Sequence, residues 1–163
     1  MMCSAKRCGM VAEAGHALYF TTIGGFAYSG TFHGRETAVF NTLYLRIACD
    51  QLHIIHLESG NELQVRAEPP FSNLRLLVAD FGVADRLIKE AVTAVIRKRF
   101  MRLSLPPRLV VHPLERLEGG LSQVEERILL ELGKGSGASK VVVHVGAPLD
   151  ATGVRACFKK SCA

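Results

Sequence analysis

Two pairs of histidines stand out among the side chains of this sequence that could perform chemistry. His53 and His56 fall within one apolar segment, and His112 and His144 each stand at the end of a separate apolar run. Imidazole can ligate a metal ion or move a proton near neutral pH, so each pair could belong to a site. Whether the two members of a pair can act together depends on the secondary structure that carries them.

His53 and His56 are three residues apart on an expected strand. Side chains alternate between the two faces of a sheet, so residues separated by an odd number of positions point in opposite directions. This spacing is poor geometry for joint ligation of a metal ion. We therefore predict that both are partly exposed strand histidines.

His112 and His144 are expected at the ends of two buried strands that follow one another along the chain. Open α/β sheets bind ligands at the carboxyl ends of their strands, so the two rings could line a pocket at that edge of the sheet. They could instead be strand-end histidines with internal hydrogen-bond partners, and the sequence favours this second interpretation.

Four of the five cysteines form two pairs with the same C-x4-C spacing, Cys3 with Cys8 and Cys157 with Cys162. Four thiolates could hold a tetrahedral zinc ion if the two chain ends met. Zinc motifs usually have tighter spacing, and both pairs fall in expected tails, so we predict free thiols. The odd number of cysteines and the lack of a dense disulfide pattern favour a reducing, cytoplasmic environment.

The acidic residues offer little for metal-dependent catalysis. Asp50 follows the first expected strand and Asp80 precedes the first expected helix, whereas two-metal nucleases hold ions about 4 Å apart with several carboxylates. Glu125 follows Ser122 in the S-x-x-E pattern of a helix capping box, which predicts a structural role for this carboxylate.

The hydrophobic pattern predicts the elements that position these side chains. Alternating segments predict three antiparallel strands over 43–48, 52–57 and 62–67, followed by an amphipathic helix over 81–100 that Asp80 caps. A strand at 109–111, a helix that begins after Ser122 and a strand at 141–145 complete a β-β-β-α-β-α-β order. This order predicts an α/β fold with a five-stranded mixed sheet flanked by helices, as in the ribonuclease-H-like superfamily, which includes actin-like half domains. We expect one domain over 42–148, an N-terminal extension over 1–41 and a C-terminal tail over 149–163.

Composition narrows the partners. The chain has 163 residues, a net charge of +5, no tryptophan and only 7 % aromatic residues. Few aromatic side chains argue against single-stranded nucleic acid as a partner. The basic residues are scattered, and the local group Arg97, Lys98, Arg99 and Arg102 suits the negative end of a helix dipole better than a nucleic-acid or lipid patch. No apolar run approaches the length of a membrane span, so we expect at most peripheral membrane contact.

Three segments in order resemble the first actin-like subdomain of the bacterial rod-shape protein family MreB. VADF is similar to the family's I-A-D-F, FMRLSLPPRLVV to F-M-R-P-S-P-R-V-L-V, and SQVEERILLELGKGSGASKV to a T-Q-V-E-R-R helix that ends in G-A-G-A-R-E-V. The resemblance covers roughly Val78 to Val143 and implies an actin-like half domain. In that family ATP binds between two domains, and the first phosphate loop reads D-x-G-T-A-N-T.

The sequence departs from that family at the nucleotide site. The corresponding turn, Ala48 to Leu52, has no glycine to let backbone N–H groups approach a phosphate. The sequence also ends before the position of the second phosphate loop. Asp50 and Glu125 remain weak candidates for contacting a nucleotide, since Glu125 matches a family glutamate suspected of orienting the attacking water.

These observations predict a non-catalytic, MreB-like bacterial protein that organises the cytoskeleton and rod shape through protein contacts, without a cofactor. Its expected partners are a full-length MreB-type filament or a second copy of itself. Two alternatives stay open: a ribonuclease-H-like, metal-dependent nuclease, and an actin-type ATPase half that completes its site by oligomerisation.

Overall fold

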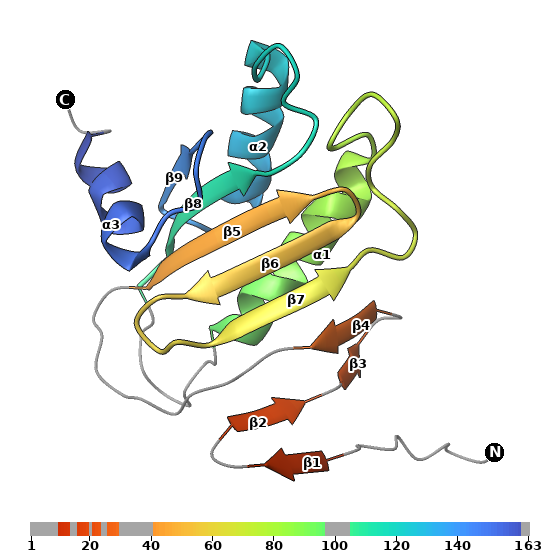
Figure 1. The fold of residues 1–163 in the computed structure, drawn as a ribbon, viewed down its shortest axis with the longest axis vertical. Coiled ribbons are helices and arrows are strands. Elements are labelled where there is room, and N and C mark those ends of the chain that lie inside the picture. Colours follow the sequence, from red (N-terminus) through yellow and green to blue (C-terminus); the bar gives the residue numbers. More distant parts are fainter. Residues whose placement is uncertain are drawn as a thin grey trace.

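The computed structural model describes residues 10–13, 16–19, 21–23, 26–29, 41–96 and 105–160. Its centre is a mixed sheet in which β5 (Thr42–Ala48), β6 (Gln51–His56) and β7 (Glu62–Arg66) form an antiparallel meander. β8 (Arg108–Pro113) pairs parallel to β5, and β9 (Lys140–Val143) pairs parallel to β8. The strand order β7-β6-β5-β8-β9 confirms the predicted five-stranded mixed sheet (Figure 1).

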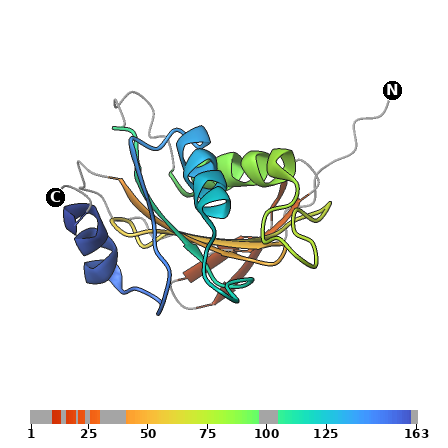
Figure 2. The same cartoon turned by 90° about the horizontal axis from the view of Figure 1, so that it is seen from above.

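Two helices cover one face of this sheet. α1 (Phe81–Val95) connects β7 to β8, and α2 (Gln123–Gly135) connects β8 to β9. Both lie on the same side in Figure 2, as parallel strands joined by crossovers of one hand require. α1 buries Leu87, Ile88 and Ala91 against Leu45 and Ile54 of the sheet, in one continuous core. The predicted apolar face of this helix is therefore confirmed, and Asp80 caps it by accepting from the Val83 N–H.

The end of α1 differs from the prediction. The described helix ends at Val95, not Phe100, and Ile96 is its C-cap. Residues 97–104, which include the basic group Arg97, Lys98, Arg99 and Arg102, lie outside the described residues.

The predicted C-terminal tail is wrong for residues 151–160, which form helix α3 (Ala151–Lys160). α3 lies on the face of the sheet opposite α1 and α2 (Figure 2), where Val154 and Phe158 bury against Tyr44 and Val110. The two buried residues are four apart and so share one helix face. Such a short apolar pattern, interrupted by Gly153 and flanked by lysines, was too brief to predict a packed helix.

The N-terminal extension also contributes structure. β1 (Met10–Glu13) pairs with β2 (His16–Tyr19) in a separate hairpin, and β3 (Thr21–Ile23) pairs with β4 (Phe26–Ser29). β4 adds antiparallel to β7, which extends the sheet to seven strands in the order β3-β4-β7-β6-β5-β8-β9. The prediction that this region lies outside the core sheet is therefore corrected for β3 and β4. Backbone pairing at a free sheet edge needs no hydrophobic periodicity, which is why the sequence did not indicate it.

None of the helices within the described residues is long and apolar enough to cross a membrane.

Candidate functional site

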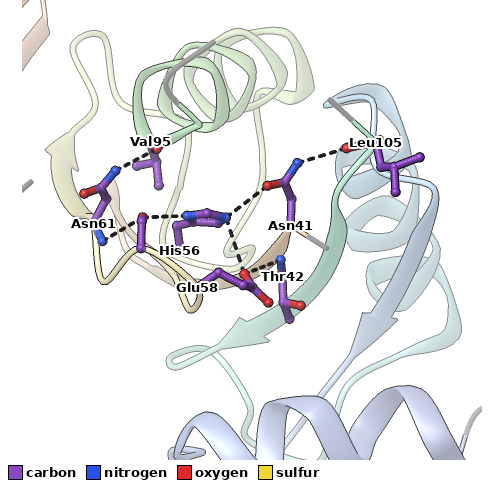
Figure 3. Close-up of polar contacts among 8 residues, drawn as sticks. Asn41, Thr42, His56, Glu58, Asn61, Val95 and Leu105 are labelled. Atoms are coloured by element: carbon purple, nitrogen blue, oxygen red, sulfur yellow. Dashed lines mark hydrogen bonds and ion pairs between the residues drawn. The ribbon is translucent and has the colours of Figure 1, made fainter. Parts of the chain in front are cut away.

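Polar side chains gather at both ends of the central strands. At the end where β5 begins lies a buried group that we call the His56 cluster, shown in Figure 3. At the other end, where β5 and β8 finish, lie Asp50, Glu115, Glu125 and the pair His112 and His144. The members of the His56 cluster come from the start of β5, the β6–β7 turn and their surroundings: Asn41, Thr42, His56, Glu58, Ser59 and Asn61.

His56 is the hub of this cluster, and its hydrogen bonds define its proton position. Its Nε2 lies 3.2 Å from Asn41 Oδ1 and 3.3 Å from Glu58 Oε2, both of which can only accept. Nε2 therefore carries the hydrogen, and Nδ1 accepts the Ser59 hydroxyl at 2.6 Å. The Asn41 orientation is supported by its Nδ2, which donates to the Leu105 carbonyl at 3.0 Å.

Burial lowers the pKa of His56, and the Glu58 carboxylate opposes this shift only in part. His56 is only 8 % exposed, so the prediction of a partly exposed strand histidine is wrong for this residue. His53, in contrast, faces the other side of the sheet as predicted, where it contacts Arg46 and the Glu62 carboxylate. The burial of His56 had no direct signal in the sequence, because its partners come from turns rather than from a recognisable motif.

The serine, histidine and glutamate of this cluster have the connectivity of an activated nucleophile, with a base oriented by an acid. The nearby backbone N–H donors nevertheless already have acceptors. The Asn61 N–H donates to Ser59 Oγ, and the Gly60 N–H donates to the His56 carbonyl. Acyl transfer needs free donors aimed at the developing oxyanion. Among the described residues the cluster is therefore better explained as a structural clamp.

The clamp joins four parts of the chain. Asn61 Nδ2 donates to the Val95 carbonyl at 3.2 Å and so holds the end of α1. Glu58 accepts from the Thr42 N–H at 2.7 Å and holds the start of β5. Through Asn41 the network also reaches Leu105, just before β8. These contacts fix the meander against the end of α1 and against the segment that leads into β8.

At the opposite end of the central strands, Asp50 occupies the β5–β6 turn with a positive φ of 56°. Its Oδ1 accepts from the Phe71 N–H, the Ser72 N–H and the Ser72 hydroxyl at 3.0, 2.8 and 2.7 Å. Burial alone would raise the pKa of Asp50, but the bonds from Ser72 and Phe71 lower it overall. The side chain thus anchors the segment that follows β7.

Glu115 is engaged with the same turn. The Cys49 N–H donates to Glu115 Oε2 at 2.7 Å, and the bonds from Cys49 lower the pKa of this carboxyl group. Burial and the adjacent Glu115 carboxylate together raise the pKa of the Cys49 thiol, although Arg116 opposes them. Cys49 and residues 114–118 line an open hollow at this edge. A negatively charged group thus already occupies a backbone N–H donor of the turn after β5.

Glu125 forms the predicted capping box. Its Oε2 accepts from the Ser122 N–H at 3.0 Å and from the Ser122 hydroxyl at 2.6 Å, while its own N–H donates to Ser122 Oγ at 3.2 Å. These bonds lower the pKa of Glu125. The residue also borders a small, mostly apolar hollow between α2 and Leu77.

The structure brings His112 and His144 together, with ring centroids 4.9 Å apart. His112 is 1 % exposed, and its Nε2 donates to the Gly146 carbonyl at 3.0 Å while its Nδ1 lies 2.6 Å from the Tyr44 hydroxyl. His144 Nε2 lies 2.9 Å from the Ala147 carbonyl. Both histidines therefore have internal partners, and the two hollows described above are lined by other residues.

The described residues contain no group of three or more metal-binding side chains of the His, Cys, Asp or Glu type. Cys157 lies half-buried on α3 and is unpaired with another cysteine. Cys3, Cys8 and Cys162 lie outside the described residues, so the terminal zinc site stays an untested prediction.

These features define the chain as an α/β protein with a mixed central sheet, crossover helices on one face and a third helix on the other. The sequence is 40 % identical over 99 residues to a protein of Escherichia coli (strain K12) that carries the description "Uncharacterized protein YjaA". The match spans 59 % of this chain and 76 % of that relative, so the chain belongs to the YjaA family. No protein-family model and no solved structure matches it.

Proposed function

We propose that this chain contains an actin-like subdomain related to the MreB family and acts through protein contacts rather than by turning over a nucleotide. The expected setting is the bacterial cytoplasm, with a cytoskeletal filament of the MreB type or a second copy of the chain as partner. The proposal builds on the sequence resemblance over Val78 to Val143 and on two structural observations.

The first observation is the topology. The meander β5-β6-β7 followed by two parallel strands, in the spatial order β7-β6-β5-β8-β9, is the arrangement expected for a ribonuclease-H-like or actin-like half. Helices α1 and α2 occupy the two crossovers that this fold requires. Fold alone does not define function, so the functional part of the proposal has to be argued from the site.

The second observation carries the functional part of the proposal. In an actin-type ATPase the turn after the first strand of the meander presents backbone N–H groups to a phosphate. Here the Cys49 N–H donates to Glu115, and Asp50 is held by Phe71 and Ser72. A phosphate at this turn would have to displace one carboxylate and approach another. Charge repulsion and the absence of glycine both disfavour that.

Protein contact is supported by exposed apolar side chains near the carboxyl edge of the parallel strands. Leu114 follows β8 and is 42 % exposed, and Val124 in the first turn of α2 is 69 % exposed. We take these two exposed apolar side chains, which lie on the same side of the sheet's strand ends, as the candidate association surface to be tested.

Two measurements on the full chain test the proposal. Calorimetric titration with Mg-ATP should give no binding in the micromolar range. Co-sedimentation with polymerised full-length MreB should place the chain in the pellet, and replacement of Leu114 and Val124 by serine should return it to the supernatant. Leu105→Ser, at the other edge of the sheet, is the matched control and should behave as the native chain does.

Micromolar Mg-ATP binding would overturn the non-catalytic part and favour an ATPase half. A chain that sediments as a strict monomer and ignores the filament would overturn the association part. Magnesium-dependent cleavage of an RNA–DNA hybrid that Asp50→Asn abolishes would favour the nuclease alternative.

A further inference from the structure

Helix α3 is joined to the sheet by a set of hydrogen bonds that requires the His112 imidazole to be neutral. We propose that the chain of hydrogen bonds through His112, Tyr44 and Leu149 is an acid-sensitive latch, which holds α3 on the sheet and releases it when His112 gains a proton. This device is independent of the partner proposed above.

The direction of each hydrogen bond in the latch is determined by chemistry. The Gly146 carbonyl can only accept, so His112 Nε2 carries a hydrogen. His112 Nδ1 then accepts the Tyr44 hydroxyl at 2.6 Å, and the Tyr44 oxygen accepts the Leu149 N–H at 3.2 Å. A second proton on Nδ1 would meet the hydroxyl hydrogen of Tyr44 head-on. The hydroxyl would have to turn its hydrogen away from His112, and this hydrogen would then compete with the Leu149 N–H for the space around the Tyr44 oxygen and weaken that bond.

The surroundings of His112 also oppose a positive charge. Burial lowers the pKa of His112, and although the bond to Gly146 acts the other way, His144 and Arg46 lower it further. Arg46 on β5 pairs with His112 across the sheet and contacts His53 on β6. These groups and Tyr44 form a row across the strands on the α3 face.

No carboxylate among the described neighbours compensates this charge. On the loop after β8, Glu115 is bonded to the Cys49 N–H. At the start of α3, Asp150 accepts from the Gly153 N–H at 2.7 Å. Glu62 on β7 contacts His53, at the far end of the row. Protonated His112 would therefore be both buried and without a counter-ion.

α3 is suited to detachment. It has ten residues, including Gly153, and among its described side chains only Val154 and Phe158 are buried. Isolated helices of this length are marginal in water, so α3 depends on its contacts with the sheet. Besides those two side chains, α3 is held by the partly buried Cys157, by the connection 144–149 and by the Lys140 ammonium, which donates to the Phe158 carbonyl.

Release of α3 would uncover apolar surface. Tyr44 and Val110, now 2 % and 0 % exposed, would face solvent together with Ile55, Leu57 and Val142. Acidification would thus turn a covered face of the sheet into an exposed apolar surface that can associate with other proteins, as in other histidine-based switches.

Hydrogen exchange followed by mass spectrometry on the full chain tests the latch. After correction for intrinsic exchange rates, protection of residues 149–160 should fall up to about tenfold between pH 6.5 and pH 5.5, the limit for uptake of one proton. His112→Gln keeps an amide donor and acceptor but does not titrate, so its 149–160 segment should show no such pH dependence.

His53→Gln is the matched control, because it removes a histidine from the same row that does not touch the 144–149 connection. It should retain the native pH dependence. If His112→Gln fails to fold by circular dichroism, NMR of the native chain replaces it: the Leu149 amide shift should titrate with the His112 ring. Unchanged native protection, the same fall in His112→Gln, or a Leu149 amide that ignores His112 would overturn the latch.

Discussion

At the residue scale, the stability of this fold depends on a few buried polar side chains that have definite partners. Asn61 is 5 % exposed and holds the last turn of α1 through the Val95 carbonyl. Removing one member of a buried hydrogen bond leaves the other unsatisfied, and this costs more than the bond itself contributes.

We therefore expect Asn61→Ala to lower the free energy of unfolding by about 1–3 kcal/mol. Urea denaturation followed by circular dichroism measures this change. Gln64→Ala on the exposed side of β7 is the control, and its effect should stay within about 0.5 kcal/mol. Equal effects of the two substitutions would contradict the clamp role of the His56 cluster.

The capping box of α2 gives a second residue-scale prediction. Ser122→Ala removes the side-chain acceptor for the Glu125 N–H and should lower the free energy of unfolding by about 1 kcal/mol. Ser122→Asp should retain most of that stability, since aspartate caps helices about as well as serine. Thermal unfolding of the three chains distinguishes a capping role from general sensitivity of this position.

At the element scale, α2 packs so closely on β9 that there is little room for a side chain larger than glycine at position 133. A Cβ added at Gly133 would lie 2.4 Å from Val141 Cγ1, and valine can adjust little because its χ1 is stiff. Gly82, in the first turn of α1, meets only Asp80 at an ordinary contact distance of 3.5 Å.

Gly133→Ala should therefore destabilise the fold by about 1–3 kcal/mol, although alanine is the better helix former. Gly82→Ala should be neutral or stabilising by up to about 1 kcal/mol. A double-mutant cycle with Val141→Ala checks the cause, because the smaller side chain at 141 should recover part of the Gly133→Ala loss. Independent, additive effects would show that the close approach is not responsible.

The elements with long, regular patterns could be predicted from the sequence. The meander, α1, β8, α2 and β9 were all predicted at their observed places to within a few residues at most ends. Helix α3 could not be predicted, because its stability comes from two apolar side chains that pack on a sheet face built from distant strands. Strand β4 could not be predicted either, because it is held by backbone pairing with β7.

The same distinction between local patterns and long-range contacts applies to the candidate site. The Asp80 cap, the capping box and the opposite faces of His53 and His56 follow from local spacing, and all three are present. The burial of His56 and the engagement of Glu115 with Cys49 depend on turns that meet only after folding. No spacing rule encodes such long-range contacts.

At the scale of the whole molecule, titration of the histidines should make stability depend on pH. Burial is the main cause that lowers the pKa of His53, His56 and His112 in the folded chain. The unfolded chain then binds more protons than the folded chain as the pH falls below about 6.5, so acid favours unfolding.

We expect the free energy of unfolding to be constant near pH 7.5 and to decrease as the pH is lowered towards 5. A further loss is expected below about pH 4, where Asp50, Glu115 and Glu125, whose pKa values are lowered in the folded state, begin to take up protons. Urea titrations at several pH values measure the profile. A stability maximum near pH 5 would contradict the assignment of the three histidines.

The central position of β5 has a consequence for the route by which the chain folds. Its antiparallel partner β6 follows after a tight turn at Cys49 and Asp50, whereas its parallel partner β8 joins at the pair Thr42 and Arg108, across the whole first crossover. Hairpins form within about 1–10 μs, but distant strands first have to overcome loop-closure entropy. We expect the meander to form early and β9 late, so Val142→Ala should speed unfolding in stopped-flow experiments far more than it slows folding.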